Sequence, residues 1–252
     1  MADWVHYLIS FAVGAGAGLF GGMFGVSGGS IAIPSMALLG HTQQVAQGTS
    51  LVMQLPNLAL GAWHYTKRGR INVRAAIVLS VAAIPFTYLG AVIATHMPSR
   101  ELRIAFGMFF IALATFQLWN AWREGRGAVT LPMRWYYLAA LGLIAGFSTG
   151  LFGLGGPALA IPTLVLFFGV AQTVAQGMAL YLSAPGTLIT LGTYAHEGDV
   201  DWGAGIALAL GAGVLVKYGV ALAHRLPEKV LRVLFGFFLY AVAALLLREA
   251  TR

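Results

Sequence analysis

Long stretches of this chain carry no charged side chain. No Asp, Glu, Lys or Arg occurs between Asp3 and Lys67, or between Arg134 and Glu197. Shorter uncharged runs span residues 75–99, 104–122, 202–216 and 233–247. Because a membrane span needs about 20 consecutive apolar residues, runs of this length predict several transmembrane helices. We therefore expect an all-α polytopic membrane protein.

The composition agrees with a membrane protein. Hydrophobic residues make up 59% of the chain and charged residues 9%, whereas a soluble domain carries about 25% charged residues. The net charge of +7 does not require a nucleic-acid partner, because cytoplasmic loops of membrane proteins collect Lys and Arg. The chain has no cysteine, which excludes disulfides and thiol chemistry. Residues 1–3 lack a basic signal-peptide region, so we expect the first apolar run to be retained.

One glycine-rich segment occurs twice. Residues 21–34 read GGMFGVSGGSIAIP, and residues 149–162, which lie 128 positions later, read TGLFGLGGPALAIP. Clustered glycines disfavour a continuous helix and leave backbone N–H and C=O groups free to bind something else. In a membrane protein such backbone survives only where it is buried in protein or lines a cavity. Two interrupted segments at corresponding places are typical of a transporter's binding site.

The two halves of the chain match beyond these segments. An offset of 129 relates residues 45–48 (VAQG) to residues 174–177 (VAQG), and Gly90 to Gly219. This register predicts an internal duplication, with a first repeat at residues 1–122, a linker at 123–134 and a second repeat at 135–252. The 37 residues from Trp4 to Gly40 are too many for one straight crossing. Each repeat should therefore hold a glycine-broken re-entrant or short helix pair plus three spans.

Two equivalent loops of the repeats differ in charge. The loop at 67–74 is basic, whereas the loop at 197–201 contains no Lys or Arg. By the positive-inside rule these loops should face opposite sides of the membrane. This predicts inverted repeats with both termini outside. A parallel eight-span arrangement gives a similar charge balance and stays open as the alternative.

The order of motifs resembles that of a known family. Each glycine-rich segment is followed by an Ala-Gln-Gly span (46–48 and 175–177) and a Tyr-x-x-x-Gly loop (65–69 and 194–198). This set resembles the TauE/SafE sulfite exporter family over about residues 10–247. The resemblance implies a bacterial inner-membrane permease for small anions such as sulfite or sulfoacetate. One departure is Pro157, which stands where the first copy has Gly29, so the two breaks need not contribute equally.

A broken helix suits an anion, because unpaired N–H groups and the positive end of the helix dipole favour anionic oxygens. The residues that we expect at the substrate site are Ser27, Gly28, Gly29, Ser30, Gln47, Gln54, Gly155, Gly156, Gln176, Ser183 and Lys217. Gln47 and Gln176 are equivalent in the two repeats, and Lys217 interrupts an apolar run, where it can supply a counter-charge. The alternatives are tight packing for the glycines, interhelical hydrogen bonds for the amides and hydroxyls, and an extension toward the headgroups for Lys217.

These features predict a secondary transporter of small sulfur-containing anions. The chain has no P-loop, so an ion gradient or the membrane potential would drive transport. An anion channel and a transporter of another small organic acid are the alternatives. An enzyme is not expected, because the apolar spans contain no Asp, Glu or Cys and no paired His. We expect no cofactor and no metal; the partners are the anion and the bilayer, with a homodimer left open.

Overall fold

The computed structural model describes residues 3–24, 28–67, 72–123, 132, 134–170, 172–223 and 228–250. Ser27, residues 68–71 of the basic loop at 67–74 and most of the predicted linker at 123–134 lie outside these ranges. Within the ranges, every regular element is an α-helix, which confirms the all-α prediction. The helices are α1 (Asp3–Phe24), α2 (Gly29–Leu38), α3 (Gln43–Lys67), α4 (Val73–His96), α5 (Ser99–Arg123), α6 (Trp135–Phe152), α7 (Gly155–Phe168), α8 (Gln172–His196), α9 (Trp202–Ala223) and α10 (Glu228–Ala250).

Seven of these helices are long and apolar enough to cross a membrane, namely α1, α4, α5, α6, α8, α9 and α10. The chain is therefore a multi-pass membrane protein. The helices α2 and α7 have 10 and 14 residues, which gives lengths of about 15 and 21 Å and is too short for the hydrocarbon core. Each glycine-rich segment thus separates one full-length helix from one short helix.

The helices form two compact units by their mutual contacts. Unit 1 contains residues 1–53, 97–126 and 200–252, and unit 2 contains residues 54–96 and 127–199. The boundary falls inside α3, so this helix contributes its first part to unit 1 and its second part to unit 2. Neither unit is a continuous half of the sequence.

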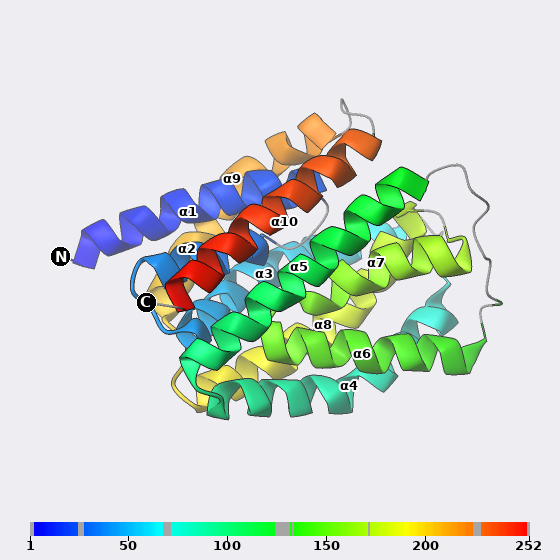
Figure 1. Ribbon diagram of the computed structural model, residues 1–252, viewed down its shortest axis with the longest axis horizontal. Coiled ribbons are helices and arrows are strands. Elements are labelled where there is room, and N and C mark those ends of the chain that lie inside the picture. Colours follow the sequence, from blue (N-terminus) through cyan, green and yellow to red (C-terminus); the bar gives the residue numbers. More distant parts are fainter. Residues whose placement is uncertain are drawn as a thin grey trace. The chain divides into compact units, whose positions relative to one another are not determined.

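In unit 1, α1 packs along α9 and α5 packs along α10 (Figure 1). The α1–α9 contact depends on glycine: a β-carbon at Gly14 would meet the backbone of Leu208, and one at Gly18 would meet the backbone of Ala212. Because both residue numbers increase together, α1 and α9 run parallel. Small residues that let two backbones approach closely are a common device of membrane helix pairs.

The helices α5 and α10 run in opposite directions. Near one end, Arg100 Nε donates a hydrogen bond of 2.7 Å to the carbonyl of Ala250. Farther along, the hydroxyls of Thr115 and Tyr240 lie 2.7 Å apart. The residue number rises on α5 while it falls on α10, so the pair is antiparallel.

In unit 2, α4 packs along α6, while α7 and α8 complete the bundle (Figure 1). Glycine again sets the close approach, because β-carbons at Gly142 and Gly146 would meet the backbones of Leu79 and Ala83. Apolar side chains of α4, α6, α7 and α8 fill the core around Leu164 and Met178. This core holds the second glycine-rich segment in place.

Candidate functional site

The second glycine-rich segment shows how its helix break is built. In unit 2, α6 ends at Phe152, and Gly153 adopts the left-handed conformation with φ of 74°. The helix α7 then starts at Gly155, directly after Leu154. In unit 1, α2 starts at Gly29 after Gly28, whose φ is −57°, and residues 25–27 lie outside the described ranges. Because its φ is positive, Gly153 needs glycine for its backbone conformation.

The residues that precede the two short helices do not cap them. Gly28 and Leu154, which precede α2 and α7, make no side-chain capping hydrogen bond. The first N–H groups of a helix have no partner within the helix. Since these helix starts also carry the positive end of the dipole, each favours a negatively charged ligand. The residues Gly29, Ser30, Gly155 and Gly156 form the first turns of the two helices.

Two of the predicted site glycines also have a packing role. A β-carbon at Gly28 would lie 2.6 Å from the carbonyl oxygen of Ala17 in α1. A β-carbon at Gly156 would collide with Thr149 Oγ1 and lie 3.1 Å from the carbonyl oxygen of Ala145. An alanine at either position therefore disturbs the fold whether or not a ligand binds there. The packing alternative explains why these positions hold glycine, without excluding a ligand at the adjoining N–H groups.

One predicted polar residue supports the second break directly. Gln54 Nε2 donates a hydrogen bond of 3.0 Å to the carbonyl of Gly153, and the Gln54 side chain is buried. This bond satisfies a carbonyl that the break in α6 frees from the helix ladder. Ser183, which was predicted with it, instead donates to the carbonyl of Ala179 in its own helix, at 2.7 Å. The structure therefore places Gln54 at the break and turns the Ser183 hydroxyl back onto α8.

The other predicted polar residues lie in varied surroundings. Gln47 is fully buried in unit 1, and Ser30 is buried at the start of α2. Gln176 is half-buried in α8. Lys217 is exposed on α9, and its Nζ lies 5.1 Å from the ring centroid of Tyr218. An exposed lysine stacked on an aromatic neighbour does not need a buried counter-ion.

Two threonines lie beside the second break that were not predicted from the sequence. A β-carbon at Gly186 in α8 would lie 3.3 Å from Thr149 Cγ2 and 3.8 Å from Thr87 Oγ1, while Thr149 also contacts Gly156. Thr149 Oγ1 donates to the carbonyl of Ala145 at 2.8 Å. These contacts connect α4, α6 and α8 to the first turn of α7.

The Thr87 hydroxyl differs from the buried hydroxyls of Thr149 and Thr190 in the same unit. Its side chain is fully buried, and among the described residues its hydroxyl has no hydrogen-bond partner. A buried threonine in a helix usually donates to the carbonyl four residues earlier, as Thr149 and Thr190 do here. An unpaired buried hydroxyl costs free energy, so a ligand or water that accepts its proton would be favoured. Spacing alone could not reveal this, because the pattern is that of an ordinary apolar helix.

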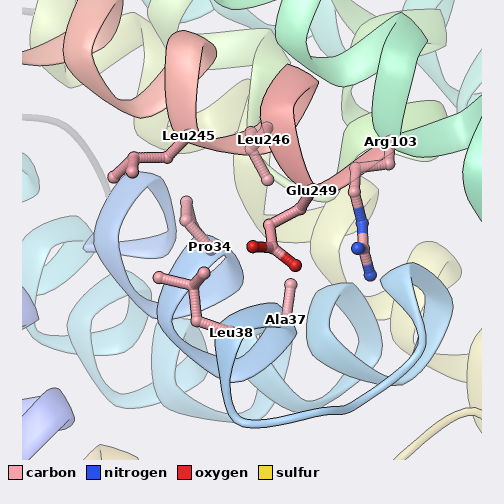
Figure 2. Close-up of a pocket in the computed structure, with 7 residues that line it drawn as sticks. All are labelled: Pro34, Ala37, Leu38, Arg103, Leu245, Leu246 and Glu249. Atoms are coloured by element: carbon pink, nitrogen blue, oxygen red, sulfur yellow. The ribbon is translucent and has the colours of Figure 1, made fainter. Parts of the chain in front are cut away.

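A separate pocket in unit 1 shares none of these residues. It is small and lined by Pro34, Ala37, Leu38, Arg103, Leu245, Leu246 and Glu249. Figure 2 shows the side chains of Arg103 and Glu249 extending from α5 and α10 toward α2. It includes none of the predicted substrate residues. Across the described part of the chain, no three His, Cys, Asp or Glu side chains are grouped so as to hold a metal ion.

Comparison with known proteins shows which family this chain resembles. The family model described as "Sulfite exporter TauE/SafE" matches residues 10–246. The chain is 24% identical to the probable membrane transporter protein YunE of Bacillus subtilis, over 97% of this chain and 98% of the relative. It is 28% identical to the probable membrane transporter protein MJ0441 of Methanocaldococcus jannaschii, over 90% of each. It is 25% identical to the probable membrane transporter protein ORF9 of a Sinorhizobium species, over 100% of this chain and 97% of the relative. No solved structure matches the chain significantly.

Proposed function

Because the chain belongs to the TauE/SafE sulfite exporter family and is a multi-pass membrane transporter, we propose that it carries small sulfur-containing anions such as sulfite or sulfoacetate. One observation carries this proposal: each unit contains a short helix at the glycine-rich segment whose N-cap residue, Gly28 or Leu154, makes no side-chain capping hydrogen bond. Such helix starts bind anionic oxygens through backbone N–H groups, without needing a cationic side chain.

The second break adds a side-chain donor to its backbone N–H groups. We place the anion at the first turn of α7, where the N–H groups of Gly155 and Gly156 and the hydroxyl of Thr87 supply the hydrogen bonds. Gln54 supports this arrangement by holding the carbonyl of Gly153. Pro157 has no N–H group, so this turn offers one donor fewer than the turn at α2, where the equivalent residue is Gly29.

The residues Gly28, Gly29, Ser30 and Gln47 form the corresponding set in unit 1, to which Ser27 would be added. In unit 2, Gln176 is the repeat-related partner of Gln47. Lys217 is exposed and is best assigned to the surface of α9. Ser183 bonds within its own helix and has a secondary role at most.

The packing supports the proposal that the chain consists of two inverted repeats. The helices α5 and α10 are equivalent under the offset of 129 residues, yet they run antiparallel in unit 1. A β-carbon at Gly107 would contact the side chain of Leu247, and one at Gly236 would contact that of Leu118. The same offset converts the first pair into the second. Repeats related in this way, with sites at interrupted helices, are common in secondary transporters.

The helix packing within each unit follows the same repeat relation. In unit 1, Gly14 of α1 packs on Leu208 of α9, and in unit 2, Gly142 of α6 packs on Leu79 of α4. Since α6 and α4 are the repeat equivalents of α1 and α9, each pair joins one helix from each repeat. We propose that repeats 1–122 and 135–252 exchange helices in this way, which explains why neither compact unit follows a sequence half.

An anion channel and a transporter of another organic acid remain the alternatives. A binding panel on the purified protein tests the proposal, with sulfite, thiosulfate, sulfate, sulfoacetate and simple carboxylates as ligands. We expect thermal stabilisation by one or more sulfur anions and little by carboxylates without sulfur. Stabilisation by carboxylates alone would favour the organic-acid transporter, and a large single-channel conductance in planar bilayers would favour the channel.

A further inference from the structure

A cluster of ionisable side chains lies at one end of unit 1, apart from both glycine-rich segments. His6 Nε2 in α1 is 3.4 Å from Asp201 Oδ2, which directly precedes α9. The rings of His6 and His41, in the turn between α2 and α3, have centroids 5.2 Å apart. The side chains of His6 and Asp201 are about one-third exposed, at 30% and 31%. Residues from three separate parts of the chain thus form one partly buried group.

The carboxylate of Asp201 is not required for its structural role. Asp201 Oδ1 accepts a hydrogen bond of 2.9 Å from the N–H of Ala204 and so caps α9. At the equivalent position before α4, the neutral side chain of Asn72 accepts one of 3.1 Å from the N–H of Ala75. The chain therefore caps one of these helices with an amide and the other with an acid. Capping needs only an oxygen acceptor, so the negative charge of Asp201 serves something else.

The cluster links α3 to α1, the helix that leads to the first break. The N–H of Asp201 donates a hydrogen bond of 3.0 Å to Thr49 Oγ1 in α3, and His6 lies near the start of α1, the helix that leads to the break. The groups that meet here come from four parts of unit 1. They are His6 and Tyr7 of α1, His41 of the α2–α3 turn, the uncharged Thr49 of α3, and Asp201, which precedes α9. The facing charge is therefore one carboxylate against two imidazoles.

Two buried polar atoms in this part of α1 have no hydrogen-bond partner among the described residues. The Ser10 hydroxyl is fully buried, one helical turn after His6. His6 Nε2 is buried and lies 3.4 Å from Asp201 Oδ2 without making a hydrogen bond. A proton on this nitrogen would allow a charge-assisted hydrogen bond to the carboxylate.

The surroundings of His41 favour its neutral form. Burial and the neighbouring His6 lower the pKa of His41, and the opposing effect of Asp201 is smaller. A lowered pKa disfavours the charged imidazole at this position.

We propose that His6, His41 and Asp201 bind the proton that is coupled to anion transport, an inference that rests on the proposed transport function. Protonation strengthens the bridge between the start of α1 and the start of α9, and through Thr49 it reaches α3. Loss of the proton weakens that bridge. Proton occupancy at this end of unit 1 therefore biases the helices that lead to the first break.

The test uses the full-length protein in proteoliposomes, with labelled sulfoacetate and the membrane potential clamped at zero. Sulfoacetate exchange at equal pH requires no net proton movement, whereas accumulation driven by a pH gradient does. For one proton per anion, a gradient of one pH unit supports about tenfold accumulation. We expect Asp201→Asn to exchange sulfoacetate within about twofold of wild type and to lose the pH-driven accumulation. His6→Gln should behave in the same way.

The chain supplies a matched control. His196 and Glu197 form another histidine–acid pair, at 3.3 Å, but the His196 side chain is 86% exposed. Glu197→Gln should keep both exchange and accumulation. Wild-type accumulation by Asp201→Asn and His6→Gln would overturn the proton site, and so would loss of exchange and accumulation together in folded variants.

Two results separate the two proposals. Wild-type protein that exchanges sulfoacetate but does not accumulate it under a pH gradient would overturn the proton coupling and leave the transport proposal intact. Wild-type protein that exchanges none of the sulfur anions of the panel would overturn the transport proposal, and the coupling with it.

Discussion

Replacing Thr87 with valine separates ligand binding from folding at the second break. Valine has nearly the shape of threonine but lacks the hydroxyl, which is buried and has no hydrogen-bond partner among the described residues. A buried hydroxyl without a partner costs about 1–3 kcal/mol. We therefore expect Thr87→Val to leave the ligand-free protein as stable as wild type or about 1 kcal/mol more stable.

Binding should change in the opposite direction. A hydrogen bond to a charged ligand contributes about 1.5–3 kcal/mol, so the loss of this bond should weaken anion affinity by about 10- to 150-fold. The assay measures the melting temperature in detergent, first alone and then in a titration with sulfite, thiosulfate and sulfoacetate. Thr190→Val is the control, because the Thr190 hydroxyl is buried but already donates to the carbonyl of Gly186 at 2.8 Å. It should bind the anions as wild type does.

Two results would refute this reasoning. If Thr87→Val binds the anions with wild-type affinity, the hydroxyl does not contact the ligand. If the ligand-free variant is markedly less stable than wild type, the hydroxyl has a structural partner, and its isolation beside Gly186 is not a sign of a binding site.

Further predictions concern the packing, the second break and the topology. Gln54→Leu should lower stability by about 1–3 kcal/mol in denaturant titrations, because it leaves a buried carbonyl unpaired; unchanged stability would show that this bond is dispensable. Gly28→Ala should lower the melting temperature because its β-carbon meets the α1 backbone, whereas Gly16→Ala, which meets nothing within 4 Å, should be neutral or gain up to about 1 kcal/mol. Cysteines at Gly69 and Glu197, in the cysteine-free chain, should react with an impermeant reagent from opposite sides; labelling of both from one side would contradict inverted repeats.

The membrane class and the helix positions follow closely from the sequence. The uncharged runs at 75–99 and 104–122 predicted spans, and α4 and α5 occupy these ranges at Val73–His96 and Ser99–Arg123. These predictions succeed because a long apolar segment in lipid can pair its backbone N–H and C=O groups in few ways other than by forming a helix. The glycine-rich segments likewise predicted the helix breaks, since both α1 and α6 end within them.

Contacts between distant segments could not be predicted in this way. Matching residues along the chain predicts two successive repeats but not which helices pack together, and the compact units combine helices from both halves of the sequence. Glycine spacing also fits both a ligand site and a close helix crossing. Only the position of the Ala17 carbonyl shows that Gly28 is needed for packing.

Polar residues were the least predictable part of the site. Gln54 was expected at the substrate site, and its side chain donates a hydrogen bond to the carbonyl of Gly153 at the second break. The sequence around Gln54 does not predict this partner. Thr87 was not predicted from the sequence. Whether its hydroxyl finds a hydrogen-bond partner depends on which neighbouring carbonyls already accept hydrogen bonds. That information exists only once the helices are packed.

The most direct test of the central claim is counterflow in proteoliposomes that contain the purified protein. Vesicles loaded with unlabelled sulfite or sulfoacetate should transiently accumulate the same labelled anion from outside, and protein-free vesicles should not. The accumulation should saturate with external anion and be reduced in Thr87→Val at subsaturating concentrations. Counterflow with simple carboxylates but with none of the sulfur anions would contradict the account, and so would the absence of counterflow with every anion of the panel.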